Sequence, residues 1–315
     1  MNVLGTFLAA SVGTIVLGLV SSWVDRKVTA RVQYRVGPPL LQPFYDVLKL
    51  MGKETLVPER AQGRGFLLAP VVGLAAAGVA AAIIWMANLK PALAPGFVGD
   101  LIVVIYLLTI PAAAVIYGAA ASGSPHAAVG ASREMKLLLA YELPLVLSAL
   151  VPVVQLARAG GAATFSLGAI VAHQQEAGWA LGSVSGFVAA AVALLCLQAK
   201  LTLVPFDLPE AETELMGGTF VEYSGPPLAI LKLLRALMLA VAPLYLATLF
   251  LGGLADPGAW GAWLALAGKY VAVLVLVVLI RNTNPRVRID QAVRFFWFGL
   301  APLAAVALVL AAVGW

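Results

Sequence analysis

The sequence predicts an all-α polytopic membrane protein, with about eight transmembrane helices and a short amphipathic interfacial helix after the first. Of its 315 residues, 62% are hydrophobic and only 11% are charged, and the mean hydropathy is +0.97. Soluble domains carry about 25% charged residues, so this chain has too few charges for an ordinary soluble surface. Apolar stretches of about 20 residues, the length that crosses a bilayer, recur along the whole chain.

The predicted spans form a single membrane domain over residues 1–315 and cover approximately 3–24, 66–88, 98–121, 136–157, 180–203, 226–252, 259–280 and 291–313. Their number would be smaller if the prolines at 144, 152 and 243 broke the fourth or sixth helix. The first span lacks a preceding basic region, which favours a retained helix over a signal sequence.

Basic residues predict the orientation. They concentrate in the segments 25–65, 122–135 and 281–290, whereas the opposite side carries only Lys90 and Arg158. Basic loops stay cytoplasmic, so these segments and 204–225 are expected on the cytoplasmic side of a prokaryotic inner membrane, with both termini on the outer face. The net charge of +5 is then explained by orientation in the lipid bilayer, and no nucleic acid partner is expected.

Redox and metal ligands are scarce. The chain has one cysteine, Cys196, and two histidines, His126 and His173, both in polar segments. Iron–sulfur and zinc sites need clusters of such residues. We therefore expect no cofactor and no metal site in this chain.

The first polar segment contains the short amphipathic helix. Gly37-Pro-Pro39 predicts an extended turn, and from Pro43 onward Phe44, Val47, Leu48 and Met51 recur at helical spacing. Such a helix lies along a membrane face or against a partner protein.

The third connecting segment is acidic. It contains five carboxylates, at Asp207, Glu210, Glu212, Glu214 and Glu222. Crowded carboxylates raise one another's pKa, which suits a group that holds and passes protons; a solvated acidic loop is the alternative. The prolines, Gly217-Gly218 and the aromatic residues of the segment favour a packed loop.

One carboxylate, Glu142, falls inside the fourth predicted span, about two turns from its start. An ionisable group inside a span is a functional-site hypothesis, because an unpaired charge there costs at least about 2.5 kcal/mol. Lys232 and Arg235 share a face of the sixth predicted helix and could supply a counter-charge to Glu142 or to the acidic segment. A proton-path role and a structural ion pair are both compatible with this pattern.

These polar segments resemble the H (ND1-like) family of complex I membrane proteins. The resemblance runs in order from about Arg26 to Arg294 and is carried by Arg31-x-Gln-x-Arg-x-Gly-Pro, Gln42-Pro, Lys49-Leu-x-x-Lys-Glu54, Tyr141-Glu-Leu-Pro, Pro205-Phe-Asp-Leu-Pro-Glu-Ala-Glu-Thr-Glu-Leu, Glu222-Tyr-Ser-Gly225 and Pro285-Arg-x-Arg-x-Asp290-Gln291. In one feature the chain departs from complex I: Gly37-Pro-Pro39 is joined almost directly to Gln42-Pro43. That compact form resembles the homologous subunit of energy-converting, membrane-bound nickel–iron hydrogenases and formate hydrogenlyase.

The resemblance implies a membrane-anchor and proton-coupling subunit that is itself non-catalytic. It would link electron transfer in a cytoplasmic arm, from ferredoxin or formate to protons with H2 evolution, to proton or sodium translocation. The implied partners are hydrogenase-like large and small subunits, an iron–sulfur (Fe-S) subunit and antiporter-like membrane subunits, with Fe-S clusters and a nickel–iron (NiFe) centre only in those partners.

The resemblance also assigns roles to residues. The proton path would comprise Glu142, Asp207, Glu210, Glu212, Glu214 and Glu222, with Lys232 and Arg235 as counter-charges. The arm would dock on Arg26, Arg31, Arg35, Gln42, Asp46, Arg133, Arg281, Arg286, Arg288 and Asp290. Two alternatives remain at this point: a quinone-site H subunit of a complex I-type oxidoreductase, and a self-contained ion transporter.

Overall fold

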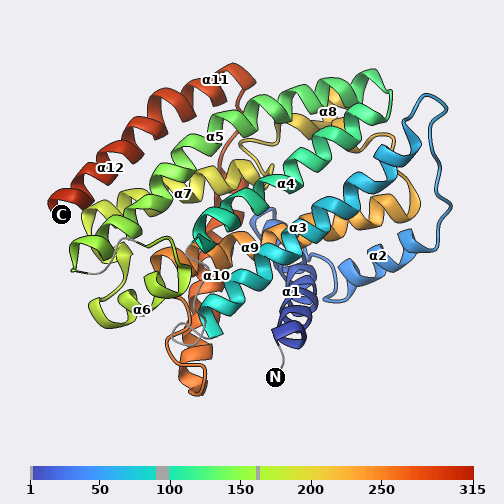
Figure 1. The fold of residues 1–315 in the computed structure, drawn as a ribbon. Coiled ribbons are helices and arrows are strands. Elements are labelled where there is room, and N and C mark those ends of the chain that lie inside the picture. Colours follow the sequence, from blue (N-terminus) through green and yellow to red (C-terminus); the bar gives the residue numbers. More distant parts are fainter. Residues whose placement is uncertain (1–2, 90–98, 161–163) are drawn as a thin grey trace.

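The computed structural model describes residues 3–89, 99–160 and 164–315, which are helical throughout their regular parts, with no strand among them (Figure 1). Lys90, one of the two basic residues expected on the outer side, lies outside the described residues. Among the described residues seven helices are long and apolar enough to cross a membrane: α1 (Val3–Val32), α3 (Gly63–Leu89), α4 (Asp100–Ala121), α5 (Pro125–Arg158), α9 (Gly225–Phe250), α10 (Trp260–Thr283) and the continuous helix Ile289–Val313.

An eighth apolar helix, α7 (Val184–Lys200), is shorter. Its 17 residues span about 25 Å at the helical rise, so it corresponds to the predicted span 180–203 but falls short of that range at both ends. The last long helix consists of α11 (Ile289–Arg294), a π-helical turn over Phe295–Leu300 and α12 (Ala301–Val313).

Short elements fill the connections. The predicted amphipathic helix is α2 (Gln42–Met51), and a helix that the sequence did not predict, α6 (Leu167–Ala177), follows α5. The acidic segment contains α8 (Glu212–Leu215) between the 3₁₀ turns Leu208–Glu210 and Gly218–Phe220; a third such turn, Ala180–Gly182, precedes α7.

Two boundary predictions were wrong. Residues 122–135 were expected to form a loop, but α5 begins at Pro125, where proline suits the first turn of a helix. The first span was expected to end near residue 24, but α1 continues to Val32. The polar side chains in these stretches do not end either helix. Inside a helix the backbone N–H and C=O groups remain hydrogen-bonded to one another, whether the side chains are polar or apolar. The prolines at 144, 152 and 243 also lie inside intact helices.

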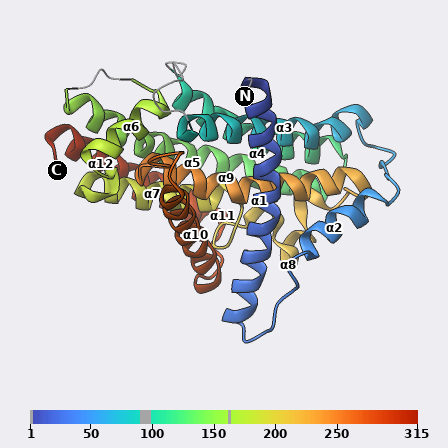
Figure 2. The same cartoon turned by 90° about the horizontal axis from the view of Figure 1, so that it is seen from below.

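The core is built around α9. In its most apolar stretch 89% of the residues are buried, against 22% in α1 and 28% in α10. Figure 2 shows α1 and α10 crossing the remaining long helices steeply. At the α1–α9 crossing a Cβ on Gly18 would lie 2.5 Å from the carbonyl oxygen of Ala236. Small residues let membrane helices approach closely, and this glycine therefore permits the crossing that brings polar residues of α1 beside α9.

Candidate functional site

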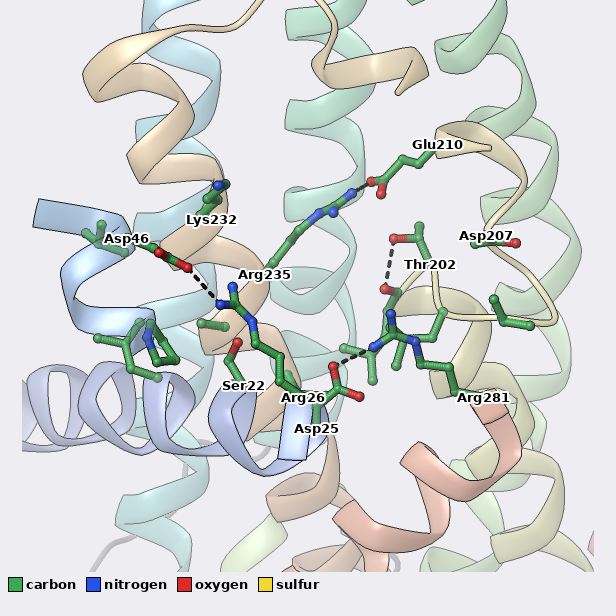
Figure 3. Close-up of a pocket in the computed structure, with 18 of the residues that line it drawn as sticks. Ser22, Asp25, Arg26, Asp46, Thr202, Asp207, Glu210, Lys232, Arg235 and Arg281 are labelled. Carbon is green, nitrogen blue, oxygen red and sulfur yellow. Dashed lines mark hydrogen bonds and ion pairs between the residues drawn. The ribbon is translucent and has the colours of Figure 1, made fainter. Parts of the chain in front are cut away.

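A cavity of about 470 Å³ lies between α1, α2, α9 and the segment that follows α7 (Figure 3). Part of its wall is apolar and includes Leu19, Ala236 and Leu239. The rest carries four carboxylates and five basic groups: Asp25, Arg26, Asp46, Asp207, Glu210, Lys232, Arg235, Arg281 and Arg286. We call this cavity the charged chamber.

Two ion pairs join α1 to its neighbours at the edge of the charged chamber. Arg281 of α10 donates to Asp25 at 2.5 Å, and Arg26 donates to Asp46 of α2 at 2.7 Å (Figure 3). Gln42 also donates to Asp46, at 3.0 Å. Burial acts to raise the pKa of Asp46, but the hydrogen bonds from Arg26 and Gln42, with the charges of Arg26 and Lys232, outweigh it and lower the pKa below its ordinary 3.8.

The acidic segment supplies the opposite wall through two further ion pairs. Asp207 pairs with Arg286, 2.5 Å apart, and Glu210 pairs with Arg235 of α9. The guanidinium of Arg235 also lies over the ring of Phe220, 4.1 Å from its centre, an arrangement in which the ring attracts the cation. The charged chamber therefore links α1, α2, α9, α10 and the acidic segment through charges.

The acidic segment is packed against the helices. Phe206 is 2% exposed and its ring lies 4.9 Å from that of Phe296, while Tyr223 stacks on Phe66 with 4.1 Å between ring centres. The Tyr223 hydroxyl donates to the Phe66 carbonyl at 3.1 Å. A Cβ on Gly130 of α5 would lie 2.9 Å from the Pro209 carbonyl oxygen, so α5 and the segment are in backbone contact. These contacts favour the packed loop over the solvated one.

Other predicted residues of the acidic segment lie outside the charged chamber. Glu214 is exposed and accepts from Arg133 at 2.5 Å. The hydrogen bond from Arg133, helped by its positive charge, lowers the pKa of Glu214 below 4.5. Glu222 is half-buried, and the side chain of Glu212 lies outside the part of the chain that the structure describes.

Four of the predicted docking residues, Arg31, Arg35, Arg288 and Asp290, are exposed and do not line the charged chamber. They lie at the end of α1, in the segment after it, and around the start of α11. A separate apolar surface on α2 includes Tyr45, Leu48 and Met51, which are 56%, 67% and 48% exposed. The buried side of α2 consists instead of Pro43 and Leu50.

Glu142 has a different partner from the predicted ones. Its Oε2 accepts from Nζ of Lys200 at 3.1 Å, and its Oε1 lies 2.7 Å from the hydroxyl of Thr109. The expected pairing of Glu142 with Lys232 or Arg235 was wrong because α5 packs mainly on α4, α7 and α12 and has little contact with α9. Arg235 instead pairs with Glu210, which agrees with the alternative expectation that it serves the acidic segment. The side chain of Lys200 is 1% exposed. A lysine inside the predicted span 180–203 was the sequence signal for it.

Glu134 is a second residue that sequence reasoning did not place in the site. It is 2% exposed, and its Oε2 has no hydrogen-bond partner among the described residues. A small cavity of about 50 Å³ is lined by Glu134, Lys200, Glu210 and Arg235 together with apolar groups. That volume accommodates a few ordered waters, each of which needs about 10–15 Å³. Glu210 of the acidic segment and Lys200, the partner of Glu142, thus border one small cavity.

The fold and site define a class: a multi-pass helical membrane protein with a charged chamber beside its central helix. The sequence matches the family described as NADH dehydrogenase over residues 5–312. The chain belongs to this family.

Similar proteins are subunits of respiratory complexes. The H subunit of the NADH-quinone oxidoreductase of Thermomicrobium roseum is 38% identical over 92% of this chain and 89% of its own length, and that of Syntrophotalea carbinolica is 36% identical over 91% and 88%. Among solved structures, a chain of the membrane-bound sulfane sulfur reductase, an archaeal respiratory membrane complex, superimposes with a TM-score of 0.83 at 30% identity, covering 99% of this chain and 100% of that one. This chain is therefore a membrane subunit of the complex I-like type, and partner subunits are expected.

Proposed function

We propose that this chain is the membrane-anchor and proton-coupling subunit of an energy-converting hydrogenase complex. A cytoplasmic arm of hydrogenase-like large and small subunits and an Fe-S subunit would pass electrons from ferredoxin or formate to protons. Neighbouring antiporter-like subunits would move protons or sodium ions. The Fe-S clusters and the nickel–iron centre belong to the partners, and this chain supplies the connection between arm and membrane.

The observation that carries this proposal is the series of ion pairs around the charged chamber. Asp25–Arg281, Arg26–Asp46, Asp207–Arg286 and Glu210–Arg235 each join different elements of the chain. A change of charge in a protein docked against them would alter several pairs together, since a nearby charge favours or disfavours the ionised form of each carboxylate. Small-molecule pockets are lined mainly by apolar groups, so this wall is better suited to charge coupling than to holding a hydrophobic ligand.

The proposed proton route begins at the acidic segment. A shift of Arg235 away from Glu210 would change the protonation of that carboxyl, because an opposite charge favours the ionised form. Glu134 lies on the same small cavity as both of these residues and is positioned to receive the change through water. Lys200 borders that cavity and bonds to Glu142, so the route continues into the membrane along α5 and α7.

Two features support the hydrogenase branch. The segment between α1 and α2 is compact, with Gly37-Pro-Pro39 close to Gln42. The chain also superimposes on a chain of the sulfane sulfur reductase over 99% of its own length and 100% of that one. The compact connection and this structural match favour the branch that includes the hydrogenases and their sulfur-reducing relatives.

A second candidate is the quinone-site H subunit of a complex I-type oxidoreductase. The names of the relatives from Thermomicrobium and Syntrophotalea favour it, as does the size of the charged chamber, since 470 Å³ falls within the range of small-molecule sites, about 300–1,000 Å³. Under this reading the apolar wall at Leu19 and Leu239 would face the ligand.

The deciding experiment is purification of the complex in mild detergent through a tag on this chain, followed by identification of subunits, metals and quinone. Nickel together with a hydrogenase large subunit supports the first candidate. Bound quinone with an NADH-type input module and no nickel overturns it in favour of the second. A chain that purifies alone and still transports ions in liposomes overturns both, in favour of a self-contained transporter.

A further inference from the structure

The surroundings of Glu142 carry information about which ion this chain handles. Three polar side chains from three helices meet there: Thr109 from α4, Glu142 from α5 and Lys200 from α7. Nζ of Lys200 lies 3.1 Å from Glu142 Oε2 and 3.3 Å from Thr109 Oγ1, and it lies over the Tyr141 ring at 5.2 Å. The ammonium group thus occupies the position between the carboxylate and the hydroxyl.

Two acceptor oxygens compete for the single hydroxyl proton of Thr109. Its Oγ1 lies 2.7 Å from Glu142 Oε1 and 2.9 Å from the Ile105 carbonyl oxygen, both of which are acceptors when Glu142 is ionised. A hydroxyl donates once and accepts twice. With Glu142 ionised, the hydroxyl donates to Oε1. With Glu142 protonated on Oε1, the carboxyl donates to Thr109, and the hydroxyl turns to the Ile105 carbonyl.

Lys200 keeps bonding partners in both protonation states of Glu142. When Glu142 is neutral, the ammonium still donates to Thr109 and lies over the Tyr141 ring. A buried cation with such partners avoids much of the penalty of an unpaired charge. The group therefore accommodates the gain and loss of one proton without moving its backbone.

A sodium ion has no free binding position among Thr109, Glu142 and Lys200. Hard cations bind to oxygen ligands and would need the two oxygens that Lys200 already contacts. Nζ would also lie within a few ångströms of such an ion, and like charges at that distance repel strongly away from water. Among the described residues no cluster of three or more acidic, histidine or cysteine side chains that could hold a metal ion is present.

We propose that Thr109, Glu142 and Lys200 form a proton-specific relay, with Lys200 as the positioning residue that excludes sodium and Thr109 as the hydroxyl that serves both protonation states. This rests on the proposed coupling function and assigns its ion: this chain passes protons even where an antiporter-like partner moves sodium. Other charged or titratable groups acting on the relay are Glu134, Tyr141, Cys196 and Tyr245.

The test is redox-triggered infrared difference spectroscopy on the purified complex in vesicles, with sodium replaced by potassium. Glu142→Gln assigns the carboxyl band. In the wild type we expect this band to respond to electron transfer and to pH, and to be unchanged by sodium. Lys200→Met should abolish the response of this band to electron transfer, and Lys200→Arg should restore the wild-type response.

Thr109→Val should keep the band but slow its appearance about tenfold, the equivalent of one hydrogen bond of about 1.4 kcal/mol. Lys269→Met and Thr283→Val are matched controls, since Lys269 bonds to the carbonyls of Leu251 and Gly253, and Thr283 to that of Leu279. Co-purification of the partners checks the assembly of each variant.

The outcomes are separable. A Glu142 band that shifts with sodium in the wild type overturns the proton-specific relay while the coupling function stands. Normal behaviour of Lys200→Met overturns the role of Lys200. The absence of any redox-linked Glu142 band, with unchanged proton transport in Glu142→Gln, overturns the coupling function itself.

Discussion

Glu142 and Lys200 face each other between α5 and α7, with 3.1 Å from Oε2 to Nζ, and the lysine side chain is almost completely buried. Removing one member of a buried pair leaves an uncompensated charge, at a cost of about 3–5 kcal/mol. The pair therefore constrains how this part of the membrane domain changes charge.

Glu142→Gln keeps the shape of the side chain and removes its ability to ionise. We expect proton translocation by the complex to fall by about 10²-fold, the usual contribution of a positioned acid–base group, while electron transfer between soluble donor and acceptor continues. Proton uptake by vesicles and electron transfer are measured on the same preparation. Glu176→Gln, at an exposed position on α6, is the control; equal losses in the two variants would contradict a specific role of Glu142.

Gly130→Ala tests the attachment of the acidic segment to α5. The new Cβ would meet the Pro209 carbonyl oxygen and the Thr219 nitrogen, each at 2.9 Å, and backbone cannot yield as a flexible side chain does. Overpacking of this kind costs about 1–3 kcal/mol. We expect faster proteolysis within residues 204–225 and impaired coupling. Gly182→Ala, which meets nothing within 4 Å, should behave as the wild type.

The Arg26–Asp46 ion pair predicts that the stability of the folded chain depends on pH. The pKa of Asp46 in the folded state lies below its ordinary 3.8. The ion pair therefore contributes its full stability above pH 3.8, and this contribution is lost as the pH falls through the lowered pKa of Asp46. The side chains of Arg26 and Asp46 are 40% and 28% exposed, so the ion pair contributes less than about 1 kcal/mol to the free energy of unfolding. Thermal unfolding of the wild type and Arg26→Gln should differ at neutral pH and converge in acid. A difference that grows in acid would contradict the assignment.

Arg288→Glu tests the proposed docking surface. Arg288 is exposed at the start of α11, and reversal of a charge at the rim of an interface mainly slows association. We expect the association rate of the arm to fall about tenfold at low salt, and the difference from wild type to diminish at high salt. Arg158→Glu, at the other end of α5 from the acidic segment, is the control. Unchanged association in Arg288→Glu would remove this residue from the docking surface.

The sequence by itself determined the membrane class, the eight apolar stretches, the amphipathic α2 and the places where carboxylates gather. These features follow from local composition and periodicity, which are independent of which helices become neighbours. Hydropathy located Glu142 inside a span in the same way.

Only the tertiary structure decided which charges meet. Lys200 rather than Lys232 or Arg235 faces Glu142, because α5 packs on α7, and nothing in local sequence specifies that neighbour. The helical state of residues 125–135 depends likewise on contacts with the acidic segment, which shelter Glu134 and meet Gly130 directly. Ion pairs and buried acids form between segments far apart in the chain, so their partners are a property of the packing.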